Sequence, residues 1–118
     1  MSHCWPRPRA IWATGLRNPF TFAQNPGASP AMLINDVGQV DWEEVNAGAA
    51  GANFGWPITE GWACTGPGDC DPTSYAGPSF DYGLADTDHC GLVAGAWVRG
   101  DAVPMLAGAL VWTDRCSG

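Results

Sequence analysis

Glycine and proline interrupt this chain so often that long helices are excluded. The 118 residues include 16 glycines and 10 prolines, about a fifth of the chain, against roughly an eighth in average usage. Such punctuation ends a helix within a few residues and leaves short extended runs between turns. The sequence therefore predicts an all-β fold of meandering antiparallel strands.

Short runs of β-forming residues mark the candidate strands. We expect them at residues 10–13, 20–24, 31–35, 79–82, 92–99 and 109–113. The turn-rich segment 25–30 joins the second and third of these runs, which predicts a β-hairpin. Residues 41–46 could form one helical turn, and residues 60–78 form a long irregular loop that holds two cysteines. Gly95 and its small neighbours are typical of a tightly packed inner strand.

The charge of the chain excludes one class of partner. There is no lysine, and five arginines face twelve acidic residues, for a net charge of −7. A basic surface for nucleic acid is therefore missing. No run approaches the roughly eighteen apolar residues of a membrane-spanning helix. The sequence thus predicts neither a nucleic-acid partner nor a membrane span.

Five cysteines are many for so short a chain. Four lie in the second half, at Cys64, Cys70, Cys90 and Cys116, and Cys4 stands alone. There is no CxxC pair, and the two histidines do not complete a zinc pattern. Disulfides are the better interpretation, and they indicate an oxidising compartment. The N-terminal segment shows no apolar core of a signal peptide, which agrees with secretion only if the true start lies upstream.

Five short motifs follow one another in a fixed order. They are GLRNPF (15–20), DVGQ (36–39), WEEVN (42–46), GANFGWP (51–57) and EG (60–61). This series resembles the glucose/sorbosone dehydrogenase family, which includes the propeller of hedgehog-interacting proteins, and the second half resembles its cysteine-bearing bacterial branch. The resemblance covers about residues 10–118 as a partial domain and leaves residues 1–9 unmatched. It implies a six-bladed β-propeller, of which this chain would form two to three blades of about 40–50 residues each.

The resemblance also implies a site for pyrroloquinoline quinone (PQQ). In the family, the turn that carries Arg17 and Asn18 faces the central cavity and contacts this cofactor. The planar donor fork of arginine suits the carboxylates of the quinone, and an asparagine amide both donates and accepts. The alternative is that Arg17 only pairs with a nearby carboxylate.

A calcium site follows from the same resemblance. The backbone carbonyls of Gly38 and Gln39 correspond to family ligands, Glu44 would add a carboxylate, and Phe54 would add its carbonyl where the family usually has tyrosine. Oxygen ligands of this kind suit a hard cation. The alternative is a simple turn in which Asp36 makes an Asx hydrogen bond.

Two other conspicuous residues are assigned no chemistry. Trp56 is expected to bury its ring between blades. His89 is interpreted as a loop histidine, because the general base of the family lies upstream of the Arg17 motif. No catalytic residue is therefore assigned to this chain.

The cysteines of the second half are expected to pair as Cys64–Cys70, across a short loop, and Cys90–Cys116, across a longer one. In the chain-entropy model these disulfides contribute at most about 2 and about 3.5 kcal/mol. Cys4 is left without a partner.

The resemblance implies that the parent protein is a secreted or periplasmic, PQQ-dependent dehydrogenase. Its substrate would be a small sugar of the aldose, glucose or sorbosone type, and it would need a separate electron acceptor. This chain would supply part of the quinone and calcium site and is expected to be inactive alone. The alternatives are a non-catalytic propeller that binds a protein or a carbohydrate, and an inactive truncated product.

Overall fold

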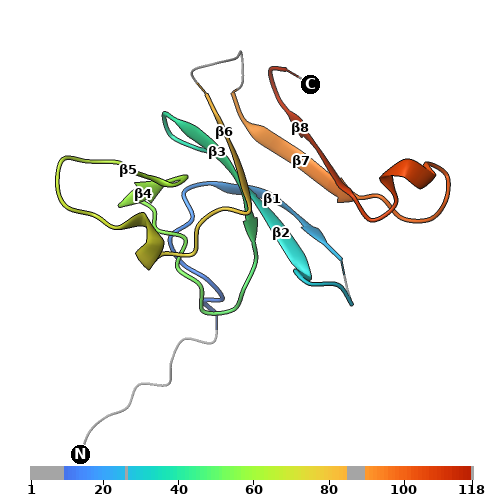
Figure 1. Cartoon of the computed structure of the whole chain (residues 1–118), viewed down its shortest axis with the longest axis horizontal. Helices are drawn as coiled ribbons and strands as arrows, with labels where there is room; N and C mark the ends of the chain where they lie inside the picture. Colours follow the sequence, from blue (N-terminus) through green and yellow to red (C-terminus); the bar gives the residue numbers. More distant parts are fainter. Residues whose placement is uncertain (1–9, 26, 85–89, 118) are drawn as a thin grey trace, which may run out of the picture.

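An antiparallel meander forms the centre of the structure. The computed structural model describes residues 10–25, 27–84 and 90–117. Its largest sheet has the strand order β1–β2–β3–β6 (Figure 1). The strands are β1 (Pro19–Gln24), β2 (Met32–Asp36), β3 (Trp42–Ala47) and β6 (Phe80–Gly83). Four-stranded sheets of this kind are the units from which propellers are built, and the predicted all-β antiparallel class is confirmed.

The first two strands form the hairpin expected from the sequence. Ala23 of β1 lies opposite Leu33 of β2, and the pairing extends from Gln24–Met32 to the other end at Pro19–Asp36. Proline lacks a backbone N–H, and it stands here at the first position of a strand that has a partner on one side only.

The third strand corrects one sequence prediction. Residues 41–46 do not form a helical turn, because Trp42–Ala47 is strand β3 and pairs with β2 on one side and β6 on the other. Two ladders of hydrogen bonds outweigh the weak helix preference of the glutamates in this segment. The strand expected at residues 10–13 is also absent, and Thr14 instead forms an isolated parallel bridge with Asn53.

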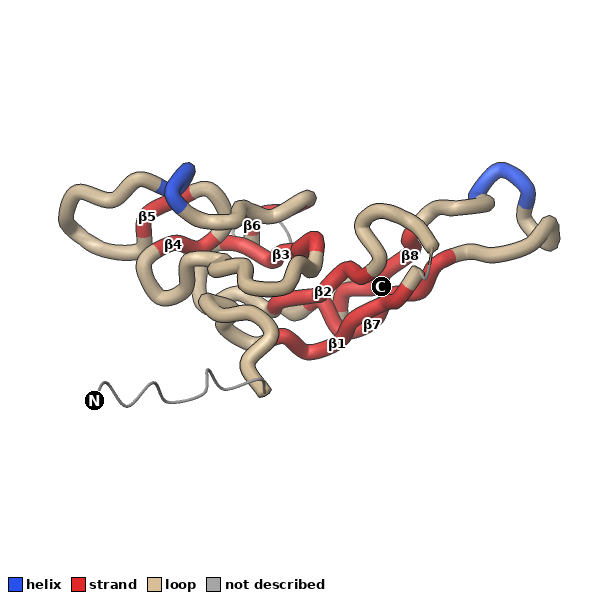
Figure 2. The backbone as a smooth tube through the Cα atoms, turned by 90° about the horizontal axis from the view of Figure 1, so that it is seen from below, coloured by secondary structure: helices blue, strands red, loops and turns tan. Residues whose placement is uncertain are grey.

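A second, two-stranded layer packs against the meander. Strands β7 (Leu92–Trp97) and β8 (Leu110–Asp114) form an antiparallel hairpin, and β7 lies against β1 and β2 (Figure 2). Leu33, Val45 and Leu92 form the buried core between the layers. A Cβ atom added to Gly95 would lie 3.1 Å from Nδ2 of Asn35, so the glycine leaves room for this side chain, as expected of a tightly packed strand.

The long loop between β3 and β6 is largely irregular, as predicted. It contains two short paired strands, β4 (Thr59–Glu60) and β5 (Ala63–Cys64), and the 3₁₀ turn η1 (Pro72–Ser74). A second 3₁₀ turn, η2 (Pro104–Leu106), connects β7 to β8. No helix among the described residues is long and apolar enough to cross a membrane.

Both expected disulfides are present. The Cα atoms are 6.1 Å apart in Cys64–Cys70 and 5.6 Å apart in Cys90–Cys116. The first disulfide closes the loop that follows β5, and the second joins the residues that precede β7 and follow β8.

The core is small, and several large apolar side chains remain at the surface. Trp12 is 44% exposed and Trp112 is 39% exposed, although tryptophan side chains normally bury most of their area. Phe20 and Phe22 of β1 are also exposed. The described chain therefore leaves apolar surface uncovered on the β1 side and on the β8 side.

Candidate quinone and calcium site

One carboxylate joins the loop before β1 to the turn after β2. Asp36, the last residue of β2, accepts hydrogen bonds from the backbone N–H of Arg17 (2.9 Å to Oδ2) and of Asn18 (2.6 Å to Oδ1). The N–H of Val37 donates to the carbonyl of Asn18 at 3.0 Å. These bonds bring together the two motifs that the sequence assigned to the cofactor and to calcium. Asp36 thus bonds to a distant loop and not, as in an Asx turn, to its own.

The Arg17 side chain binds the turn after β2 through oxygen atoms. Nη1 donates to the carbonyl oxygens of Val37 at 2.9 Å and Gly38 at 2.6 Å, and Nε donates to Oε1 of Gln39 at 2.8 Å. The guanidinium carbon lies 5.8 Å from the ring centre of Trp56, within cation–π range. Among the described residues, this guanidinium donates to no carboxylate, and Nη2 has no hydrogen-bond acceptor. One part of the guanidinium holds the turn, and Nη2 is available to an anion.

A small cavity adjoins this turn. Its volume is about 10 Å³, roughly the space of one water molecule or one ion. Among the predicted calcium ligands, Gly38, Glu44 and Phe54 line it, whereas Gln39 does not. Asn18 also lies outside the cavity, and its side chain is exposed. The fold therefore brings together three residues that are widely separated in the sequence.

Three buried carboxyl groups surround the cavity. Asp36, Glu44 and Glu60 are 4%, 8% and 5% exposed. Burial raises the pKa of Asp36 and of Glu44, although hydrogen bonds to both groups partly offset it. The negative charge of Glu60 raises the pKa of both groups further. A cation among these carboxylates would relieve the repulsion and favour their ionised forms.

Glu44 sits beside a buried polar atom that has no partner. Its Oε1 accepts a hydrogen bond from the N–H of Gly61 at 2.5 Å, and its Oε2 accepts from Nδ2 of Asn46 at 3.0 Å. Asn46 is 0% exposed, and its Oδ1 has no hydrogen-bond partner among the described residues. Buried oxygen atoms are normally hydrogen-bonded or bound to a cation. Carboxylates, carbonyls and an unpaired amide oxygen are the ligand types that calcium prefers, so the residues present fit this ion.

Glu60 and Trp56 have contacts that were not expected from the sequence. Glu60 accepts hydrogen bonds from the backbone N–H groups of three consecutive residues, which are Gln39, Val40 and Asp41. Trp56 is half-buried and packs against Arg17, in addition to any role between blades. Both residues belong to the motif series, and this membership is the sequence signal that could have identified them.

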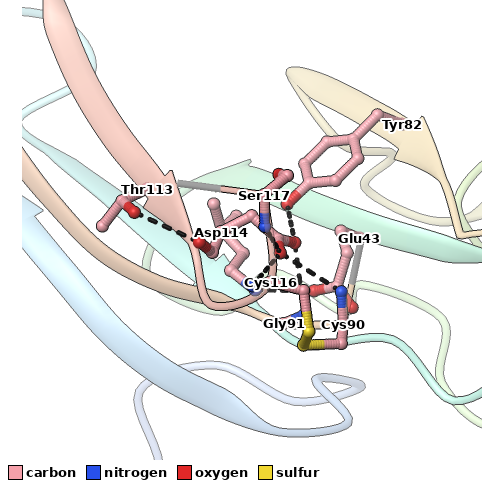
Figure 3. Close-up of a disulfide and its surroundings, with 9 residues drawn as sticks. Glu43, Tyr82, Cys90, Gly91, Thr113, Asp114, Cys116 and Ser117 are labelled. Atoms are coloured by element: carbon pink, nitrogen blue, oxygen red, sulfur yellow. Dashed lines mark hydrogen bonds between the residues drawn. A yellow bond between two sulfur atoms is a disulfide. The ribbon is translucent and has the colours of Figure 1, made fainter. Parts of the chain in front are cut away.

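A second polar cluster lies on the face of the sheet that carries β7 and β8 (Figure 3). The Asp114 carboxylate accepts hydrogen bonds from the hydroxyl of Tyr82 at 2.9 Å, the N–H of Cys116 at 2.8 Å, and the N–H groups of Cys90 and Gly91 at 3.2 Å. The disulfide between Cys90 and Cys116 closes the same loop. Because the two sulfurs are bonded to each other, they are not thiolate ligands for a metal. This cluster fastens the ends of the second layer.

Two sequence interpretations fall outside the described residues. These are the loop role given to His89 and the unpaired state given to Cys4. Both stay predictions.

The fold and the site define a class of protein. It is an all-β protein with an antiparallel four-stranded meander and two disulfides, in which turn motifs gather oxygen atoms around an arginine. The glucose/sorbosone dehydrogenase family profile matches residues 6–113, and the chain belongs to this family.

Two curated relatives are similar to this chain and are much longer than it. It is 30% identical over 115 residues to the HIPL1 protein of Arabidopsis thaliana, a match that covers 88% of this chain and 16% of the relative. It is 40% identical over 48 residues to the aldose sugar dehydrogenase YliI of Escherichia coli (strain K12), a match that covers 41% of this chain and 13% of the relative. The chain thus spans about a sixth or less of these relatives. No solved structure matches it.

Proposed function

We propose that this chain supplies part of the quinone and calcium site of a PQQ-dependent sugar dehydrogenase. The observation that carries the proposal is the position of Arg17, whose Nη1 is bound by two backbone carbonyls while Nη2 has no acceptor among the described residues. Membership of the glucose/sorbosone dehydrogenase family and similarity to an aldose sugar dehydrogenase support the same function.

Each residue of the site has a distinct task. Arg17 would hold a carboxylate of the quinone through its unoccupied donor, and Asn18, which is exposed, would offer a further amide. Gly38, Glu44 and Phe54 supply oxygen ligands for calcium from around the cavity, and Gln39 adds its carbonyl from the turn. When bound, the quinone accepts the hydride of the sugar, and the calcium ion polarises the quinone oxygen. The chain's own residues bind and orient these groups.

The parent protein acts, on this proposal, outside the cytoplasm on a small sugar and passes electrons to a separate acceptor. Two disulfides support an oxidising compartment. The general base is not assigned to this chain, so the chain alone is expected to be inactive.

Quinone binding tests the proposal directly. PQQ is titrated into the chain in the presence of calcium, and the quenching of tryptophan fluorescence is followed for the wild type, Arg17→Ala and Arg115→Ala. Arg115 is an exposed arginine outside the site and controls for the loss of one positive charge. A charge-assisted hydrogen bond is worth about 1.5–3 kcal/mol, so Arg17→Ala should weaken binding by about 10- to 150-fold.

Equal affinities for all three proteins would remove Arg17 from the site. Absence of quinone binding by the wild type would contradict the proposed function and favour the alternative of a non-catalytic propeller or a truncated product. The longer match to the HIPL1 protein than to the sugar dehydrogenase is the reason to keep this alternative in the test.

A further inference from the structure

The turn after β2 points its N–H groups toward Glu60 and its carbonyls in the opposite direction, toward Arg17. The N–H groups of Gln39 and Val40 both donate to Oε1 of Glu60, the second at 3.2 Å, and the N–H of Asp41 lies 3.4 Å from Oε2. Three successive N–H groups around one anion form a nest. Glu60 is 5% exposed, so this carboxylate is enclosed by the backbone that it binds.

Peptide geometry links this anchor to the cation side of the turn. The N–H of Gln39 and the C=O of Gly38 belong to one planar trans peptide unit and point in opposite directions. With the N–H held by Glu60, the carbonyl is directed away from it, and it accepts the bond from Nη1 of Arg17 at 2.6 Å.

A second carboxylate holds the preceding peptide unit. Glu43 on β3 accepts a hydrogen bond from the N–H of Leu92 at 3.1 Å, and its carboxylate interacts with the backbone of Gly38, which helps to lower its pKa. The peptide unit of the Gly38 N–H carries the carbonyl of Val37, which lies 2.9 Å from Arg17. Each of the two carbonyls that face the cation therefore has a buried carboxylate behind its own peptide unit.

The residue at position 38 permits this arrangement. A Cβ atom on Gly38 would lie 2.7 Å from Oε1 of Glu60 and would overlap the carbonyl of Trp42. Any larger residue would push the turn away from the carboxylate and rotate its carbonyls. Close approach of backbone to an ion is one of the uses of glycine.

We propose that Glu60 is a positioning residue for the cation site. It binds the N–H side of the turn 38–41 and so directs the Gly38 carbonyl toward the cavity side of the turn, where Arg17 lies in this structure and where calcium would bind beside it. Glu43 does the same for the carbonyl of Val37. This inference rests on the proposed function for the identity of the metal. The clamp, by which we mean the hydrogen bonds that hold the N–H groups of the turn 38–41 to Glu60, rests on the contacts described above.

Terbium is a suitable probe because it resembles calcium in size and ligand preference, and because nearby tryptophan sensitises its luminescence. Trp56 lines the cavity. The chain is titrated with Tb³⁺, and calcium is used as the competitor. Glu60→Gln is compared with Asp69→Asn, which removes one negative charge from an exposed loop position. Loss of a residue that orients metal ligands commonly costs about 10- to 100-fold in affinity, and we expect this loss for Glu60→Gln and less than about twofold for Asp69→Asn.

A metal-free measurement separates positioning from direct ligation. In ¹H–¹⁵N spectra, the amide protons of Gln39 and Val40 should lie downfield in the wild type, because they donate to a carboxylate. They should move upfield in Glu60→Gln, while the amide signals of β7 and β8 stay in place and show that the fold is intact.

The outcomes are distinct. Unchanged amide shifts in Glu60→Gln would overturn the clamp, including the case in which terbium binding is lost, because Glu60 would then be a direct ligand. Changed amide shifts with wild-type terbium affinity would also overturn it. A wild type that binds no terbium would contradict the proposed function, and the clamp is then judged by the amide shifts alone. If Glu60→Gln does not fold, Gly38→Ala provides the second test, since it should displace the same amide signals and weaken terbium binding with Glu60 intact.

Discussion

Asp114→Asn is expected to destabilise the chain strongly, because one carboxylate accepts hydrogen bonds from the residues before β7, from those after β8 and from Tyr82 of β6 (Figure 3). Asp114 is 5% exposed and accepts from the hydroxyl of Tyr82 and from the N–H groups of Cys90, Gly91 and Cys116. An asparagine keeps one acceptor oxygen, but it places an NH₂ group where the other oxygen was. This NH₂ group would face the N–H and O–H donors that now bond to the carboxylate, and it cannot accept hydrogen bonds from them.

The magnitude follows from the donors left unpaired. A buried donor that loses its acceptor costs about 1–3 kcal/mol. Asp114→Asn leaves about two donors unpaired. Among the N–H donors, that of Gly91 is buried and those of Cys90 and Cys116 are part-buried, and the losses are not fully additive within one network. We therefore expect a loss of about 3 kcal/mol in the free energy of unfolding, a large part of the roughly 5–15 kcal/mol of a typical domain. The Cys90–Cys116 disulfide limits how far the loop can move to find other partners.

The pH dependence gives a second signature of the same carboxylate. Burial would raise the pKa of Asp114, but hydrogen bonds from Cys116, Tyr82, Cys90 and Gly91 outweigh it and lower the pKa to about 2, from its ordinary value of 3.8. A depressed pKa stabilises the folded state above the unfolded value, and this contribution is lost as the pH falls from about 4 to about 2. Asp114→Asn should remove this acid-sensitive part of the stability.

Urea unfolding followed by tryptophan fluorescence, at pH 7 and at pH 2.5, measures both effects. Asp101→Asn is the matched control, because Asp101 is an exposed aspartate in the connection between β7 and β8. Surface substitutions of this kind change stability by about 0.5 kcal/mol or less. If Asp114→Asn is as stable as Asp101→Asn at pH 7, the hydrogen-bond cluster does not stabilise the fold and the reasoning is wrong.

Three other measurements test the remaining features of the molecule. Without metal, the free energy of unfolding should rise as the pH falls from 7 toward the ordinary values of 3.8 for aspartate and 4.5 for glutamate, because burial raises the folded-state pKa of Asp36, Glu43 and Glu44. This contribution is fully present below the ordinary values and is lost as the pH rises through the raised pKa values. A flat or opposite profile would contradict it. Glu44→Gln should weaken terbium binding more than about tenfold because it removes a charged oxygen ligand beside the cavity, and an unchanged terbium affinity would count against a cation site. Replacing the two cysteines of one disulfide by serine should lower the free energy of unfolding, measured by thermal unfolding, by at most about 2 kcal/mol for Cys64–Cys70 and about 3.5 kcal/mol for Cys90–Cys116. A larger loss for Cys64–Cys70 than for Cys90–Cys116 would refute the chain-entropy argument.

Features set by short stretches of chain were predictable from the sequence. The β1–β2 hairpin follows from two extended runs around a turn-rich segment, and the β7–β8 strands follow from similar local patterns. The disulfide pairs followed once the cysteines were placed in the family. Gly95 marked a tightly packed strand because a missing side chain in a strand usually serves a close neighbour, here Asn35.

Features that depend on distant segments were not predictable in the same way. Strand β3 looks locally like a helical turn because it contains two consecutive glutamates. Its pairing with β2 on one side and with residues 80–83 of β6 on the other makes it a strand. The hydrogen bonds to Glu60 come from a turn about 20 residues earlier in the chain. Motif order indicated that Arg17 and Gly38 belong to one site, but only the backbone path shows that Arg17 binds the carbonyls directly.

The two consecutive glutamates of β3 connect the site to the second layer. Side chains alternate along a strand, so Glu43 and Glu44 necessarily face opposite sides of the sheet. Glu44 accepts from Gly61 beside the cavity, and Glu43 accepts from Leu92 of β7 while it also holds the peptide unit of Gly38. A slip of one residue in the pairing of β3 would put Trp42 or Val45 where one of the two glutamates stands and would leave one of the two sets of N–H donors without an acceptor. The same residues that prepare the cation site therefore fix the register of β3, and any change that moves β7 away from Glu43 should be felt at the carbonyls that face Arg17.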